Sequence, residues 1–136
     1  MASLKEDIDS MANWVSEALK SSGYRADFSP NSLAEIERFF SEQVKNGVVV
    51  EGGFLSEEVG TRLFAIGSYC GEVLRREIGG EWITDDNDPQ GELNVSLQLA
   101  NAQLCWPVQR VMKRFNSSEG NIVFWANELG SGVLPE

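Results

Sequence analysis

Apolar residues recur at spacings of three and four at the start of the chain, and this is the periodicity of an amphipathic helix. The pattern predicts a first helix over about residues 3–21, which Ser22-Gly23 ends. Its apolar stripe consists of Leu4, Ile8, Met11, Val15 and Leu19.

A second helix with the same periodicity is predicted next. It begins at Ser29-Pro30, because proline suits the first helical position, or alternatively at a capping box formed by Ser32 and Glu35. Asn46-Gly47 is expected to end it. Its buried stripe is Leu33, Ile36, Phe40 and Val44.

The longest helix is predicted in the middle of the chain. The apolar run 48–50 is too short to assign to a helix or a strand, and Gly52-Gly53 follows as a loop. Ser56-Glu57-Glu58 then starts a helix that runs to about Ile78, because acidic residues stabilise a helix N-terminus. Gly79-Gly80 ends it. One side carries Leu63, Ile66, Cys70, Val73 and Glu77.

The spacing of apolar residues then changes from the helical period to a period of two residues. Residues 93–99 alternate strictly between apolar and polar side chains, which is typical of a half-buried strand. Ala100-Asn101 reverses the chain into a hairpin partner over 103–106, and residues 81–84 are predicted as a third antiparallel strand.

Helical spacing returns after this meander. Pro107 opens a helix that directs Val108, Val111, Met112 and Phe115 inward and Arg110, Lys113 and Arg114 outward. Residues 122–129 also have helical spacing, although their Ile-Val-Phe-Trp run would suit a strand; we predict a helix. The order of elements predicts an α+β fold with N-terminal helices, a long central helix, a small antiparallel three-stranded meander and C-terminal helices.

The length of 136 residues predicts a single domain. We divide it into an N-terminal helical part (1–50), an α+β core part (54–130) and a flexible tail (131–136). The sequence contains neither a signal-peptide pattern nor an apolar stretch long enough to span a membrane, so we expect a cytoplasmic protein. Cys70 and Cys105 are expected to be reduced and buried.

The net charge of the chain limits the kinds of molecule that we expect it to bind. Asp and Glu number 21 against 11 Lys and Arg, which gives a net charge of −10. This balance disfavours nucleic acids and anionic membranes as partners and favours a basic protein. The alternative interpretation is that the acidity serves solubility alone.

The chain contains no histidine and two cysteines. General acid–base catalysis near neutral pH usually relies on imidazole, and a four-ligand Cys/His zinc site cannot be assembled. We therefore expect no catalytic residues, no metal and no cofactor. A carboxylate-dependent enzyme is the least favoured interpretation.

Five acids and no base lie within the twelve residues 81–92: Glu81, Asp85, Asp86, Asp88 and Glu92. Asp86 and Asp88 match the first ligand positions of an EF-hand loop, but Leu97 occupies the position that needs a bidentate glutamate. We interpret the segment as a solvated turn. If the partner is basic, Asp85, Asp86 and Asp88 are the candidate steering residues.

Gly67 and Gly71 lie four residues apart in the predicted long helix, where each costs about 1 kcal/mol relative to alanine. We expect another element to pack closely on them; the alternative is the approach of a partner or ligand. Directly after them, Glu72 and Arg76 have the spacing and order of a favourable helical ion pair.

Two polar groups near this helix are candidate binding residues. Glu72 and Arg75 form either a surface pair or a brace to the sheet, or else a polar anchor for a partner. Asn94, Ser96 and Gln98 share the second face of the predicted strand, which is either a solvated outer face or an amide-lined binding surface near Gln103.

The run from Tyr69 to Arg75 has the form Tyr-x-Gly-Glu-x-x-Arg, and Gly79-Gly80-Glu81-Trp82 follows it. With the later hairpin and the Pro107 helix, this pattern resembles small acidic bacterial proteins of uncharacterised function over about residues 60–130. The resemblance implies the fold and not an activity. Similar small acidic proteins serve as immunity proteins beside bacterial toxins, which is an analogy only.

These observations lead to one main functional hypothesis and one alternative. The main hypothesis is a non-enzymatic, acidic protein-interaction module, in its narrower form an immunity or inhibitor protein that binds a basic effector. The alternative is a small-molecule-binding or accessory domain that uses the Gly67/Gly71 face and the Asn94/Gln98 surface.

Overall fold

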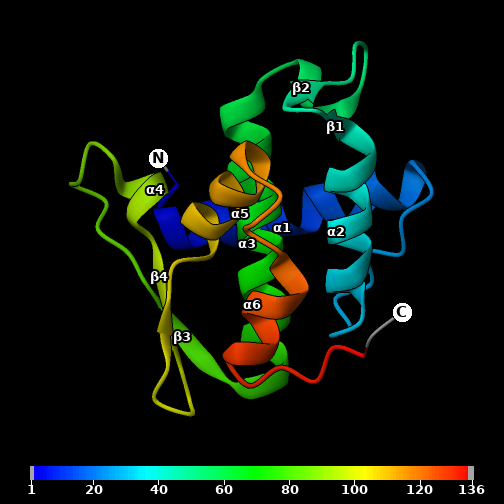
Figure 1. The fold of residues 1–136 in the computed structure, drawn as a ribbon. Helices are drawn as coiled ribbons and strands as arrows, with labels where there is room; N and C mark the ends of the chain where they lie inside the picture. The colour runs from blue at the N-terminus through cyan, green and yellow to red at the C-terminus, as the bar shows by residue number, and fades with distance from the viewer. Residues whose placement is uncertain (1, 135–136) are drawn as a thin grey trace.

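A computed structural model describes residues 2–134 of the chain and confirms the predicted α+β class (Figure 1). Within residues 2–134, six α-helices accompany a two-stranded sheet and a three-stranded antiparallel meander of order β3-β4-β5. The elements are α1 (Leu4–Ser21), α2 (Ser32–Gln43), β1 (Val44–Lys45), β2 (Val48–Val49), η1 (Phe54–Ser56), α3 (Val59–Ile78), β3 (Gly80–Ile83), α4 (Gly91–Asn94), β4 (Ser96–Leu99), β5 (Leu104–Cys105), α5 (Pro107–Asn116) and α6 (Ile122–Glu128).

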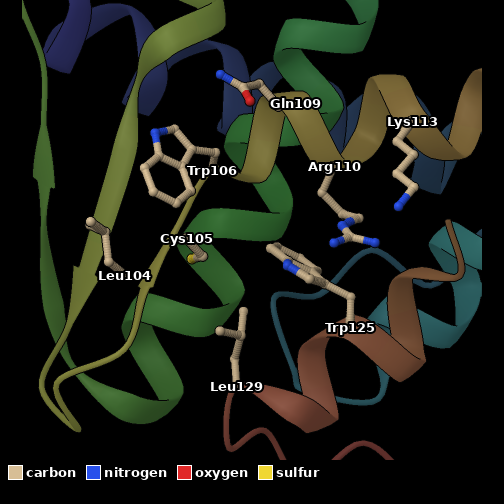
Figure 2. A pocket seen from close by; sticks show the side chains of 8 residues that line it. All are labelled: Leu104, Cys105, Trp106, Gln109, Arg110, Lys113, Trp125 and Leu129. Atoms are coloured by element: carbon tan, nitrogen blue, oxygen red, sulfur yellow. The ribbon is translucent and has the colours of Figure 1, made fainter.

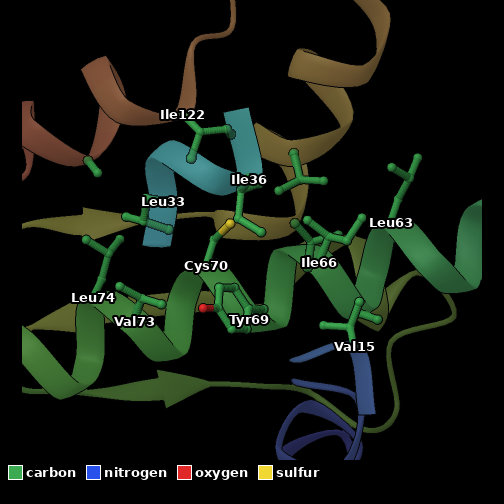
Figure 3. Packing of buried hydrophobic residues seen from close by; sticks show 14 of the residues in the cluster. Val15, Leu33, Ile36, Leu63, Ile66, Tyr69, Cys70, Val73, Leu74 and Ile122 are labelled. Carbon is green, nitrogen blue, oxygen red and sulfur yellow. The ribbon is translucent and has the colours of Figure 1, made fainter. Parts of the chain in front are cut away.

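Helix α3 forms the centre of the core. Every residue from Leu63 to Leu74 is buried, so the helix is enclosed on all sides and not on one apolar side as its spacing predicts. Helices α1 and α5 pack most extensively against it, and β3 and β4 also contact it. In Figure 3, Val15 of α1 lies on one side of α3, while Ile36 of α2 and Ile122 of α6 lie on the other.

The two glycines of α3 are sites of close packing, as predicted. A Cβ atom on Gly67 would lie 2.6 Å from Cα of Val108, and a Cβ on Gly71 would overlap the indole of Trp82. The missing side chain at Gly67 leaves room for the backbone of α5 at Val108. The missing side chain at Gly71 leaves room for the Trp82 indole of β3. A small molecule therefore cannot bind at the Gly67/Gly71 face, as the alternative hypothesis proposed, because protein atoms fill that face.

Helix α1 confirms its prediction and α2 differs at both ends. A capping box between Ser3 and Glu6 begins α1. The predicted box at Ser32 is wrong: the Ser32 hydroxyl donates to the Ser29 carbonyl, and the Glu35 carboxylate accepts from the backbone N–H of Arg25 and from Arg38. Turns that begin at Ser29, Pro30 and Asn31 lead into the helix, which starts at Ser32, so Pro30 is not its first residue.

The Asn46-Gly47 pair is the turn of a β-hairpin and not a helix terminator. Helix α2 ends at Gln43, and β1 and β2 pair in the register Val44↔Val49. Both turn residues have positive φ, 54° and 78°, which two-residue hairpin turns require and which asparagine and glycine tolerate best.

Two further predicted boundaries are wrong for local reasons. Helix α3 begins at Val59, because Ser56 lies in η1, where its hydroxyl donates to the Gly53 carbonyl and does not cap the helix. The predicted strand over 93–99 is a strand only from Ser96. Residues 91–94 form the helical turn α4, in which the Asn94 amide donates to Asp88.

The meander and the last helices agree with their predictions, with one exception. Strand β3 pairs with β4 through Trp82↔Leu97, and β4 pairs with β5 through Leu97↔Cys105. Helices α5 and α6 are present, so the helical interpretation of residues 122–129 is confirmed. The prediction that Arg114 points outward is wrong, because the residue is only 7% exposed.

Part of the segment predicted as a flexible tail, 131–136, packs on the protein. Ser131 and the backbone N–H of Gly132 donate to the carboxylate of Glu77. Val133 is buried in the core, and the Leu134 N–H donates to Asn31. Residues 135–136 lie outside the described residues.

Gly71→Ala is expected to destabilise the domain by about 1–3 kcal/mol, because the new methyl group overlaps the Trp82 indole. The loss should be smaller in a Trp82→Phe background, where the overlapping ring atoms are absent, and a double-mutant cycle from urea denaturation measures this coupling. Gly60→Ala, in the same helix with open space around its Cβ, is the control. Equal losses in both backgrounds would contradict the contact.

Candidate functional site

The carboxylate of Glu72 is the centre of a polar cluster between α3 and the sheet. Arg75 donates to both of its oxygens, at 2.7 and 2.9 Å, and Arg76 lies 3.5 Å away. The indole Nε1 of Trp82 donates to it at 2.8 Å. Burial alone would raise the pKa of Glu72, but the hydrogen bonds from Arg75 and Trp82 and the two guanidinium charges lower it overall.

This geometry favours the brace over the binding anchor as the role of Glu72. The residue is 4% exposed, and the bond to Trp82 ties α3 to β3 at the same place where Gly71 receives the indole. Arg75 and Arg76 remain about 40% exposed and can face a partner. Glu72 and Arg75 therefore form an ion pair, as predicted, but the Glu72 carboxylate is too buried to contact another molecule.

The candidate loop 85–91 lies against the first turn of α1, which the sequence did not indicate. The backbone N–H of Leu4 donates to Asp86 at 2.9 Å, and Figure 1 shows the start of α1 near α4. The hydrogen bond from Leu4 to Asp86 places the acids of the loop beside those of the first turn of α1, and we call these acids the acidic surface. It consists of Glu6, Asp7, Asp85, Asp86, Asp88 and Glu92.

Hydrogen bonds within the loop fix two of the three candidate aspartates, Asp85 and Asp88. Asp85 accepts from the backbone N–H of Asn87, and Asp88 accepts from the N–H of Gln90. The side-chain hydrogen bond from Asn94, followed by the one from Gln90, lowers the pKa of Asp88. Among residues 2–134, no group of three or more His, Cys, Asp or Glu side chains is arranged to hold a metal ion.

Asn94, Ser96 and Gln98 do not form a common binding surface. Asn94 belongs to α4 and bonds Asp88, while Ser96 is only 7% exposed. Gln98 is exposed, and its amide donates to the Gln103 carbonyl, so the predicted proximity of these two residues is correct. The predicted amide-lined surface fails because the alternation it relied on extends through a helical turn.

A buried ion pair that the sequence analysis missed joins three helices. Arg114 of α5 donates to both carboxylate oxygens of Glu37 at 2.9 Å, and the N–H of Ile122, at the start of α6, donates to Glu37 at 2.7 Å. The signal was present: Glu37 and Arg114 each fall within the apolar stripe of their helix, at helical spacing from Leu33 and Val111.

Both cysteines are free and buried, as predicted. Burial raises the pKa of the Cys105 thiol to about 12 and raises that of Cys70 as well. Both groups are therefore protonated at neutral pH, and neither is a ready nucleophile.

Comparisons with known proteins add no relative. No protein-family model, curated protein or solved structure matches the chain. Within residues 2–134, no helix combines the length and the apolarity that crossing a bilayer requires. The roles of the surfaces must be inferred from their own geometry and charge.

Glu72→Gln is expected to lower the free energy of unfolding by about 1–3 kcal/mol at neutral pH, because it weakens charge-assisted hydrogen bonds. The pKa of Glu72 is lowered in the folded state, so its contribution is complete above the usual pKa of about 4.3 and is lost as the pH falls through the folded value. Denaturation of parent and variant should therefore converge in acid. A pH-independent difference would contradict this assignment, and the exposed Glu128→Gln is the control.

Glu37→Ala is expected to cost about 3–5 kcal/mol, because it leaves the Arg114 charge buried without its partner. Glu37→Gln should cost less, since the amide oxygen can still accept from Arg114 and from the Ile122 N–H. Urea midpoints compare the two variants. Equal losses would mean that these hydrogen bonds contribute nothing beyond the charge.

Proposed function

We propose that the protein is a non-enzymatic interaction module that binds a basic protein, in the specific form of an immunity or inhibitor protein that covers a basic effector. The acidic surface carries this proposal. It brings acids from two distant segments together, and Lys5 is the only base within residues 3–9 and 81–92.

The fixed geometry of the acidic surface supports a role in recognition. Asp86 is held by the N-terminus of α1, and the hydrogen bonds within the loop set the positions of Asp85 and Asp88. A concentrated field of one sign raises the association rate with an oppositely charged protein and suppresses acidic competitors. The net charge of −10 acts in the same direction at longer range.

The non-enzymatic part of the proposal is supported by the occupation of the buried ionisable groups. Glu72 and Glu37 are held by arginines and backbone or indole donors, and the two thiols are protonated at neutral pH. Each of these groups already has a structural role. A catalytic carboxylate would instead need access to a substrate.

Replacing Asp85, Asp86 and Asp88 together by Asn is expected to slow association with the basic partner severalfold at low salt and to leave the dissociation rate and the stability nearly unchanged. Asn keeps an acceptor oxygen for each backbone N–H, and the one bond that is lost is the exposed bond from the Asn94 amide to Asp88, so the loop retains most of its hydrogen bonds. Association rates are measured by stopped flow at low and high salt, with the basic protein that co-purifies from the native cells.

The matched control is Glu51→Gln, Glu57→Gln and Glu119→Gln, which changes the net charge equally at exposed positions outside the acidic surface. It should slow association much less. Equal slowing by both triple variants would assign the effect to net charge, and an association rate independent of salt and of both variants would refute the proposal.

A further inference from the structure

A groove outside the acidic surface lies between α5, α6 and the end of the meander. Its walls are Leu104, Cys105, Trp106, Gln109, Arg110, Lys113, Trp125 and Leu129, and its volume is about 360 Å³. Figure 2 shows Trp106 and Leu104 on one side, Trp125 and Leu129 on the other, and Cys105 between them. This volume is in the range typical of small-molecule sites.

The walls of the groove expose large apolar side chains. Trp106 is 43% exposed and Leu104 is 41% exposed. Trp125 is nearly buried and so provides a fixed indole at the opposite wall. Apolar side chains left in contact with water around a concavity mark a binding site, and indoles favour flat apolar groups.

Two cations face the same groove one helical turn apart. Arg110 lies over the Trp125 ring, 5.8 Å from its centroid, and Figure 2 shows Lys113 directed towards the same region. Among the described residues, neither has a carboxylate within 4.0 Å, although acids outnumber bases by 21 to 11 in the chain. No acid lines the groove. Six other cations of residues 2–134 are ion-paired: Lys20, Arg25, Arg38, Arg75, Arg76 and Arg114.

We infer that this groove binds a small organic anion with a flat apolar body, such as an aromatic carboxylate. The indoles contact the body, and Arg110 and Lys113 bind the anionic group. A small ligand is favoured over an acidic protein, because a large acidic surface would be repelled by the net charge of −10, whereas a single carboxylate meets mainly the two nearby cations. This inference does not rest on the proposed function.

The test uses two fluorescent probes that share one apolar body and differ by the sulfonate group: anilinonaphthalene sulfonate and its uncharged counterpart phenylnaphthylamine. The sulfonate should bind at one site per chain and about tenfold or more tightly than the amine, since one such factor corresponds to about 1.4 kcal/mol. Arg110→Gln with Lys113→Gln should remove this preference and leave the binding of the amine nearly unchanged.

Two matched controls separate the groove from general effects. Lys5→Gln with Lys45→Gln makes the same charge change at exposed positions outside the groove, and it should keep the preference. Trp106→Ala should weaken both probes, whereas Trp14→Ala, which removes an equally exposed indole elsewhere, should not. Circular dichroism shows whether each variant is folded.

Three outcomes would overturn the inference. Equal affinities of the parent for the two probes would mean that the cations do not select an anion. Equal loss in both double-Gln variants would assign the effect to net charge. Binding of a synthetic peptide rich in Asp and Phe, without binding of the sulfonate, would identify the groove as a site for a protein segment.

Discussion

The enclosure of α3 on every side is the constraint on which the rest of the structure depends. A helix with neighbours at all angles needs room for their backbones and a partner for each polar group that it buries. Gly67 and Gly71 provide the room, for α5 and for the Trp82 indole. The carboxylate of Glu72, the next residue in the chain, accepts a hydrogen bond from the nitrogen of that same indole. One contact between helix and sheet therefore fills the space beside Gly71 and supplies a hydrogen bond to the buried Glu72 carboxylate, whereas the buried Ser68 hydroxyl of the same helix has no hydrogen-bond partner among residues 2–134.

Much of this architecture could be predicted from the sequence, because periodicity reports which segments are amphipathic. It located α1, α5 and α6, the hairpin of β4 and β5, and the close packing at the two glycines. The prediction from periodicity failed where a side-chain hydrogen bond determined the local structure. Ser56 bonds Gly53 and not a helix start, and Asp88 holds Asn94 in a helical turn where alternation alone predicts a strand.

The candidate site was less predictable, since it depends on pairings between distant segments. The loop around Asp86 was found from its composition, but its contact with Leu4 spans 82 residues and has no local signal. Glu37 and Arg114 carry opposite charges within apolar stripes, which makes each conspicuous without identifying its partner. The groove combines β5, α5 and α6, so its charges and indoles meet only after the chain has folded.

The packing of the segment after α6 has a consequence for synthesis on the ribosome. Val133 completes the core, and Asn127 holds its backbone through two hydrogen bonds, while Leu134 is bonded to Asn31 at the start of α2. Chains emerge from the N-terminus at about 5–20 residues per second. Until residues 131–134 have left the exit tunnel, Glu77 of α3 and Asn31 at the start of α2 lack the partners that this segment supplies, and the core lacks the Val133 side chain. The hydrogen bonds that hold this segment to α3 and to the start of α2 can therefore form only after translation has passed Leu134.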